Sequence, residues 1–517
     1  MKNLKNMKKI LVFILLTVSL VSLNSCMEDI LDQKPLGQNY SDVFWVNKQG
    51  AEKGLAGAYS LFRSNLLNGA SYLMWGEFPG MFLLNTPQWI VGYIHSGNYV
   101  LAYWDYTREW ERFYHVVTLT NIIQKRVGEM DVNKFKTTSS TPDAEAQKEK
   151  DRIMGEALFL RAYSYFYMVR IWGDVPLITT AIESSDQLVD DNGFVIGLER
   201  SPEVDVLKQI LADLDQAKKW LDYGTPGDRN WAVQANRGSV EALEAHASAW
   251  LASRVTGAEQ TTNLARSKAA CDNVITKSGA SLVDYSVENA VRDMFEGQST
   301  EGIFELNVNT TQNEAFRIYR SENTHIGLTL DEPFQDAKNS NVAKTSFDFG
   351  KGLINRNPED YRITQFFYNW GPNGFLSKYS AMSPDGASTD KFAYFSESNV
   401  ILMRLADIIL LRAEVLAKQG KFAEAAKDLN TIRNRANLPN YEGTDADMLV
   451  EIFNQRSIEL VGEGHCAFDR IRFNYFEGVG FMSASRVAQK GYFWPVRENY
   501  LLINRKLTQN EYWRGKL

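Results

Sequence analysis

Apolar residues recur at the spacing of an α-helix over long stretches of this chain, and this periodicity constrains the fold more than any other feature. Over 151–172, one helical face is formed by Ile153, Ala157, Leu160, Tyr163, Tyr167 and Ile171. Gly173-Asp174-Val175-Pro176 ends this helix, because glycine permits a left-handed stop and proline cannot continue the ladder. Further helices are predicted over 202–222, 236–254, 262–277, 400–437 and 446–463. The fold class is therefore expected to be mostly α.

The helical pair over 405–438 resembles one tetratricopeptide unit. Gly420 and Phe422 mark its turn, and the small residues Ala413 and Ala425 would let the two helices approach closely. The other helices repeat this pattern with poor fidelity, and a generic helical hairpin is the alternative. We expect a tetratricopeptide-like scaffold of helical pairs.

Two long segments, about 68–106 and 280–395, lack this periodicity. The first mixes Gly, Pro, Asn and aromatic residues, and the second carries short β-like pieces such as 302–306 among loops. Long irregular stretches inside a compact chain are usually functional or disordered, and the aromatic content disfavours disorder. They are predicted to be loop-rich insertions with minor β-structure. Residues 137–147 are expected to form a polar linker.

The first 25 residues have the pattern of a bacterial export signal. Lysines precede an apolar run of about 14 residues, whose helix would span roughly 21 Å and is too short for a bilayer core of about 30 Å. Leu23-Asn24-Ser25-Cys26 is similar to a lipobox, which predicts lipidation of Cys26 and a tether over 26–45. The alternative is an ordinary cleaved signal in which Cys26 is incidental. Residues 46–517 are expected to form a single domain.

Composition excludes several classes of protein. A net charge of −7 without a long basic run argues against nucleic-acid binding. Three cysteines without CxxC spacing exclude a disulfide scaffold and a zinc site, and no histidine pair has metal-ligand spacing. No second apolar segment reaches about 18 residues, so no membrane span is expected. We expect no metal and no cofactor.

Short motifs from residue 29 to the last residues match those of a known family. They are Asp29-Ile30-Leu31-Asp32, Pro35, Phe44-Trp45, 160–177, 404–414, 456–472, Trp494-Pro495 and Asn504 with Gln509-Asn510. Together they resemble the SusD/RagB family of surface nutrient-binding lipoproteins of Gram-negative bacteria. The resemblance implies a helical scaffold that presents ligand from its variable segments and lies over a SusC-like TonB-dependent transporter. It also implies a lipid-anchored position in the outer membrane, facing the extracellular side.

The charged residues in these motifs are predicted to be structural. Arg456, Glu459, Glu463, Asp469 and Arg472 resemble a catalytic cluster, but paired charges that support a helix junction explain their spacing. The chain contains no Gly-x-Ser-x-Gly elbow, no HExxH and no P-loop. We therefore expect a non-catalytic protein.

The family pattern is broken at three positions. Gln455 stands where Glu is usual, Cys466 where Arg is frequent and Arg497 where Pro is common. All three lie in scaffold motifs, so they put local ion-pair partners in question.

Sugar recognition needs aromatic faces for the C–H face of a pyranose, and amides, carboxylates or arginine for its hydroxyl groups. The candidates are Trp75, Trp89, Tyr93 and Trp104 in the first segment, and Tyr319, Arg320, Trp370 and Asn373 in the second. Burial between loop and scaffold is the alternative for each. Trp110 and Tyr114 are assigned to the helix core.

The expected function is non-catalytic binding of oligo- or polysaccharide at the cell surface and its delivery to the transporter. The alternative is capture of peptides or protein fragments for import, which the RagB side of the family suggests. A hydrolase on the same scaffold is a third and weaker possibility.

Overall fold

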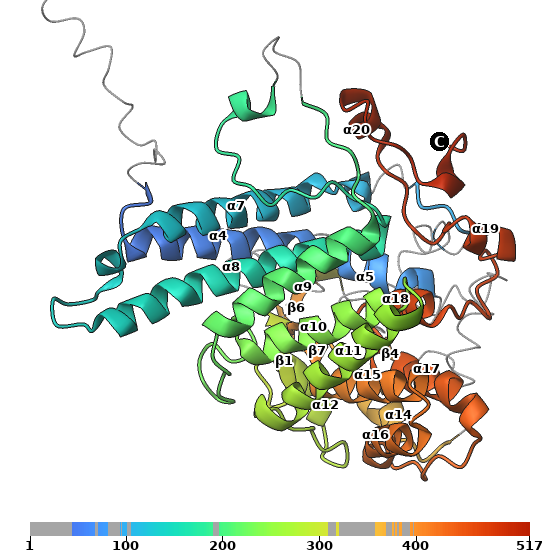
Figure 1. Cartoon of the computed structure of the whole chain (residues 1–517). Coiled ribbons are helices and arrows are strands. Elements are labelled where there is room, and N and C mark those ends of the chain that lie inside the picture. The colour runs from blue at the N-terminus through green and yellow to red at the C-terminus, as the bar shows by residue number, and fades with distance from the viewer. Residues whose placement is uncertain are drawn as a thin grey trace, which may run out of the picture.

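Long helices that pack on their neighbours in the sequence form the scaffold of the chain (Figure 1). The computed structural model describes residues 44–67, 71–80, 94, 96–100, 105–189, 196–308, 317–319, 357–368, 375–376, 378–379, 382–384, 393–396 and 398–517. The first layer contains α4 (Lys48–Leu67), α7 (Glu111–Glu129) and α8 (Asp143–Trp172). The next helices are α9 (Glu203–Trp220), α10 (Arg237–Ala252) and α11 (Gly257–Lys277). The predicted mostly α fold is confirmed.

The C-terminal helices pack back onto this array. The first of them, α15 (Leu405–Lys418), lies against α10 and α11 and pairs with α16 (Phe422–Arg435). The chain continues through α17 (Met448–Glu459), α18 (Cys466–Phe473), α19 (Ala484–Ala488) and α20 (Glu498–Ile503). The α15–α16 pair occupies the predicted position, and its tetratricopeptide character stays a prediction.

The strands are short and belong to the second variable segment and its borders. Strand β1 (Gly302–Leu306) pairs antiparallel with β7 (Val400–Arg404), and both strands are fully buried. Strands β2 (Arg317–Tyr319), β6 (Ala393–Ser396) and β5 (Met382–Pro384) form a small sheet in that order. A third pair joins β3 (Phe367–Tyr368) to β4 (Phe375–Leu376). The predicted minor β-content is confirmed.

Helix α8 lies at the centre of the core. Every residue from Gly155 to Trp172 is buried, because α4, α7 and α9 cover this helix on several sides. Its aromatic rings pack against other elements, as Phe159 does against Phe304 of β1 at a centroid distance of 4.8 Å. The helix ends as predicted at Gly173, whose φ is +75° and whose N–H donates to the carbonyl of Val169. Much of the aromatic content therefore serves packing between helices.

The start of α8 corrects the sequence analysis. The helix begins at Asp143, so the part of the predicted 137–147 linker from that residue onward is wrong. Pro142 precedes the helix in an extended conformation, and Asp143 and Glu145 place negative charge in the first turn. Acidic residues at this position complement the helix dipole. Because these residues are polar, the start of the helix shows no apolar periodicity in the sequence. Among the described helices, none is long and apolar enough to cross a membrane.

Candidate ligand-binding site

A buried network of charges joins the C-terminal half of the chain around Arg404. Its guanidinium lies 2.6 Å from Glu301, 2.9 Å from Glu459 and 2.8 Å from Glu463, and all four side chains are almost completely buried. Burial opposes the ionisation of Glu459, but Arg435 and Arg404 outweigh it and hold the pKa of this carboxyl well below its usual range. The charges are therefore compensated inside the fold.

The remaining motif charges tie three helices together. Arg456 of α17 lies 2.8 Å from Asp407 of α15 and 2.7 Å from Asp469 of α18. Arg472 lies 2.7 Å from Glu414 of α15. The prediction that these charges support a helix junction is confirmed. In the part of the chain that the structure describes, no group of three or more acidic, histidine or cysteine side chains is placed to hold a metal ion.

The start of the first variable segment is anchored on this junction. Helix α5 (Ser71–Gly76) and the 3₁₀ turn Phe78–Gly80 are fully buried. Gly76 approaches the backbone so closely that an added Cβ would lie 1.9 Å from the Gly464 carbonyl oxygen. The Arg470 Nε donates to the Gly80 carbonyl at 2.6 Å, and the Gly464 N–H donates to Glu77 at 3.1 Å. This end of the segment is thus fixed to α18 and the turn before it.

The far side of the same segment is anchored on the C-terminal tail. Arg486 donates to the Gly97 carbonyl at 2.9 Å. Tyr99 is fully buried and stacks on Trp494 with ring centroids 4.6 Å apart. The described residues at both ends of this segment are therefore fixed to the scaffold.

The second variable segment docks on the same stretch of chain. Lys378 donates to the Glu463 carboxylate at 2.6 Å and to the Glu459 carbonyl at 2.8 Å. The hydroxyl of Tyr379 donates to the Gly462 carbonyl at 2.7 Å. Both segments are thus held by residues 459–470, which places parts of the chain that are about 300 residues apart on one junction.

Two departures from the family pattern fit this docking. Gln455 accepts a hydrogen bond from Arg362 at 2.9 Å, and Asp360 supplies the carboxylate for the same guanidinium at 2.8 Å. Cys466 lies where Gly80 makes its close approach, since a Cβ on Gly80 would be 2.6 Å from the Cys466 sulfur. A small side chain at 466 leaves room for that contact.

Trp75 was predicted to contact ligand, but the structure places its side chain in the core. Its side chain is 2% exposed, its Nε1 donates to the Thr107 carbonyl at 2.8 Å, and its ring packs on Phe113. The docking of α5 on the junction carries this ring inward, so Trp75 belongs to the core rather than to a surface platform. Trp110 is 5% exposed and packs on Tyr500, which confirms its assignment to the core. Tyr114 is half-buried, and its hydroxyl donates to the Pro176 carbonyl at 2.6 Å.

Of the other predicted residues, the structure places only the backbone of Tyr319. Tyr319 lies in β2, where its backbone pairs with Ala393. The candidates outside the described residues are Trp89, Tyr93, Trp104, Arg320, Trp370 and Asn373, together with the lipidation residue Cys26.

Two family models match the chain. The model described as the SusD family matches residues 355–513, which include the docking stretch. The model described as "Starch-binding associating with outer membrane" matches residues 86–226.

Some relatives match over most of the chain and others over part of it. A SusD-like protein of Formosa agariphila, P38, is 26% identical over 98% of this chain and 99% of its own length. The starch-binding protein SusD of Bacteroides thetaiotaomicron is 29% identical over 26% of this chain and 25% of its own length. The crystal structure of a SusD homologue from the same organism superposes with a TM-score of 0.69 at 23% identity, over 90% of this chain and 98% of that structure.

The fold defines a class of mostly helical proteins in which one junction holds described parts of two variable segments. The chain belongs to the SusD/RagB family. SusD-like proteins are carbohydrate-binding proteins without catalytic activity, and the prediction that this chain is not an enzyme is confirmed by its membership.

Proposed function

We propose that this chain is a cell-surface lipoprotein that binds oligo- or polysaccharide and hands it, uncut, to a TonB-dependent outer-membrane transporter. The observation that carries the proposal is the docking of both variable segments on residues 459–470. Segments held on one junction are able to act on one ligand, and aromatic residues on loops held by a rigid scaffold are typical of binding sites. The starch-binding description of one family model supports a glycan as the ligand class.

Calorimetric titration of a polysaccharide panel tests the ligand class. We expect binding by wild type and a loss of about 2 kcal/mol or more, or about thirtyfold in affinity, for Trp89→Ala or Trp370→Ala. Both positions are proposals from the sequence. Trp75→Phe is the matched control, because this ring is buried and its substitution should leave affinity unchanged.

Three outcomes would change the proposal. Glycan cleavage by the pure protein would refute non-catalytic binding. Binding of peptides alone would favour the import of protein fragments. Glycan binding that survives both tryptophan substitutions would keep the ligand class and discard the two residues.

The lipid anchor and its orientation need a separate test. Cys26→Ala should leave the protein unprocessed or release it from the membrane fraction, because the acyl chains supply the attachment. Protease treatment of intact cells should remove the wild-type protein if it faces outward. A Cys26→Ala protein that is processed and fractionates like wild type would contradict the anchor.

A further inference from the structure

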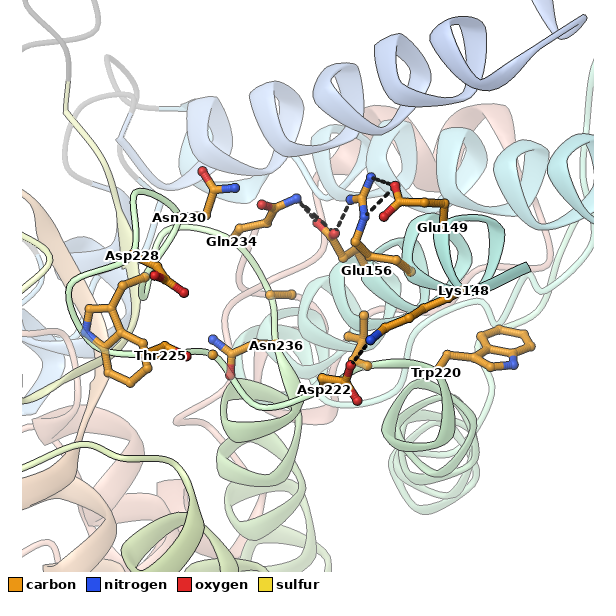
Figure 2. Close-up of a pocket in the computed structure, with 15 residues that line it drawn as sticks. Lys148, Glu149, Glu156, Trp220, Asp222, Thr225, Asp228, Asn230, Gln234 and Asn236 are labelled. Atoms are coloured by element: carbon orange, nitrogen blue, oxygen red, sulfur yellow. Dashed lines mark hydrogen bonds and ion pairs between the residues drawn. The ribbon is translucent and has the colours of Figure 1, made fainter. Parts of the chain in front are cut away.

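A pocket of about 190 Å³ opens between the first half of α8 and the 221–236 connection from α9 to α10 (Figure 2). None of its lining residues comes from 68–106 or 280–395. The pocket is therefore built entirely by the helical scaffold, outside the two segments proposed to present ligand.

The base of the pocket is a fixed polar cluster centred on the buried carboxyl group of Glu156. Arg152 donates to it at 2.6 Å, the hydroxyl of Tyr59 at 2.7 Å and the Gln234 amide at 2.9 Å. Figure 2 shows Gln234 and Glu156 joined in this way. The Tyr59 hydroxyl in turn accepts from the backbone N–H of Ala235 at 2.8 Å, which ties the cluster to the connection. These contacts hold the polar base in one arrangement.

Two amides on this base each keep one unused hydrogen-bonding atom. Gln234 uses its Nε2 on Glu156, which leaves its Oε1 as an acceptor. Asn236 caps α10 by accepting from the N–H groups of Gly238 and Ser239, which leaves its Nδ2 as a donor. Neither atom has a hydrogen-bond partner within the described part of the chain. A fixed donor and a fixed acceptor on lining residues are thus available to a ligand without having to be ordered on binding.

The mouth and walls add the remaining features of a sugar site. Thr225, Asp228 and Asn230 are exposed, and their side chains make no hydrogen bond to other described residues. Leu221 and Ala235 are buried and supply apolar wall. An apolar wall with hydroxyl, carboxylate and amide groups at the opening matches what a pyranose offers.

Apart from Asp228 at the mouth, the charged side chains of the pocket are already paired. Lys148 lies 2.5 Å from Asp222, and Arg152 contacts Glu149 at 3.2 Å as well as Glu156. An anionic ligand would have to displace one of these pairs, and a cationic ligand would find only the exposed Asp228 carboxylate, whereas a neutral polyhydroxylated ligand uses the unused amides and the groups at the mouth. The pocket volume is below the roughly 300–1,000 Å³ of sites for drug-sized ligands.

We propose that this pocket is a second carbohydrate subsite that holds one neutral sugar ring, either free or at the end of a glycan. Binding here requires neither the aromatic segments nor the transporter, so it stands apart from the function proposed above.

Saturation-transfer NMR on the purified full-length protein in detergent tests the subsite directly. The probes are D-glucose, D-galactose, D-mannose, D-xylose and N-acetyl-D-glucosamine at millimolar concentrations, with glycine and dialanine as non-sugar probes. We expect at least one sugar to bind, and Asn230→Ala or Asp228→Ala to weaken it about three- to tenfold, the loss of one hydrogen bond. Arg229→Ala is the control, since this exposed side chain lies on the same connection but does not line the pocket.

Thermal melting verifies that the variants keep the fold, and Trp89→Ala and Trp370→Ala separate this site from the segments. Sugar binding that both tryptophan variants retain and at least one pocket variant weakens would support the subsite, whatever the polysaccharide titration gives. The subsite is overturned if no sugar binds, if only glycine or dialanine binds, or if neither pocket variant weakens sugar binding.

Discussion

At the scale of the residue, Arg404 supplies charge that several carboxylates need. Replacing it by methionine keeps much of its volume but removes the cation shared by Glu301, Glu459 and Glu463. Because buried carboxylates would lose compensation, Arg404→Met should lower the free energy of unfolding by about 3–5 kcal/mol, measured by chemical denaturation. Arg292→Met, which breaks an exposed pair with Glu296, is the control and should change little. Equal stability of the two variants would contradict the structural role of the network.

Glu77 should make the free energy of unfolding fall as pH rises, whereas an acid paired with a cation makes it rise with pH. Burial raises its pKa to about 8 from an ordinary value of 4.5, and its Oε1 has no partner in the described structure. The folded state keeps this proton while the unfolded state loses it, so stability falls as pH rises from about 4.5 to 8, by up to about 1.4 kcal/mol per pH unit. Glu77→Gln should remove this loss in unfolding measured at pH 5 and pH 8, with Glu477→Gln as an exposed control. A Glu77→Gln protein that loses stability between these pH values as much as wild type would exclude the effect.

At the scale of the element, the α15–α16 pair predicted from small residues is open to a packing test. Ala413 and Ala425 are both fully buried in helices that contact each other. Ala413→Leu should overpack this contact and destabilise the protein by about 1–3 kcal/mol, measured by thermal or chemical unfolding. Ala423→Leu, on an exposed position of α16, is the matched control and should melt near wild type. An unchanged melting temperature for Ala413→Leu would mean that the two helices do not cross at this residue.

The elements also show what can be predicted from this sequence. Helices such as α9 and α10 have a strong apolar periodicity and a clear stop signal, so their predicted ranges agree with the structure within a few residues. Helix α17 was also predicted, but it ends at Glu459 and not at 463. The first turns of α8 were missed because their residues are polar and show no apolar periodicity. Helix α5 was missed because six residues are too few to show a helical period. The burial of Trp75 depends on Gly76 approaching Gly464, which is a contact between distant parts of the chain. The scaffold pocket was missed because its polar base joins residues that are distant in sequence, since Glu156 accepts hydrogen bonds from Tyr59 and from Gln234.

At the scale of the whole molecule, the helical array and the C-terminal junction have different tasks. The array around α8 supplies the core, in which the buried Arg161 is paired with Asp213 at 2.6 Å. Residues 459–470 then hold both variable segments against that core through backbone carbonyls and a few long side chains. Variation in the segments is therefore compatible with a constant scaffold, since the docking contacts involve backbone atoms or residues of the family motifs.

This division predicts that a docking contact affects ligand binding without touching ligand. Tyr379→Phe removes the hydrogen bond that its hydroxyl donates to the Gly462 carbonyl, at 2.7 Å. The second segment should then be held less firmly, so ordering it on ligand binding should cost more free energy. We expect glycan affinity, measured by calorimetry, to fall about two- to tenfold. Tyr475→Phe, which loses an exposed bond to Glu477 at 2.6 Å, is the matched control and should bind like wild type. If Tyr379→Phe binds glycan as tightly as Tyr475→Phe, the junction holds the fold but does not tune the site, and the two segments present ligand independently of it.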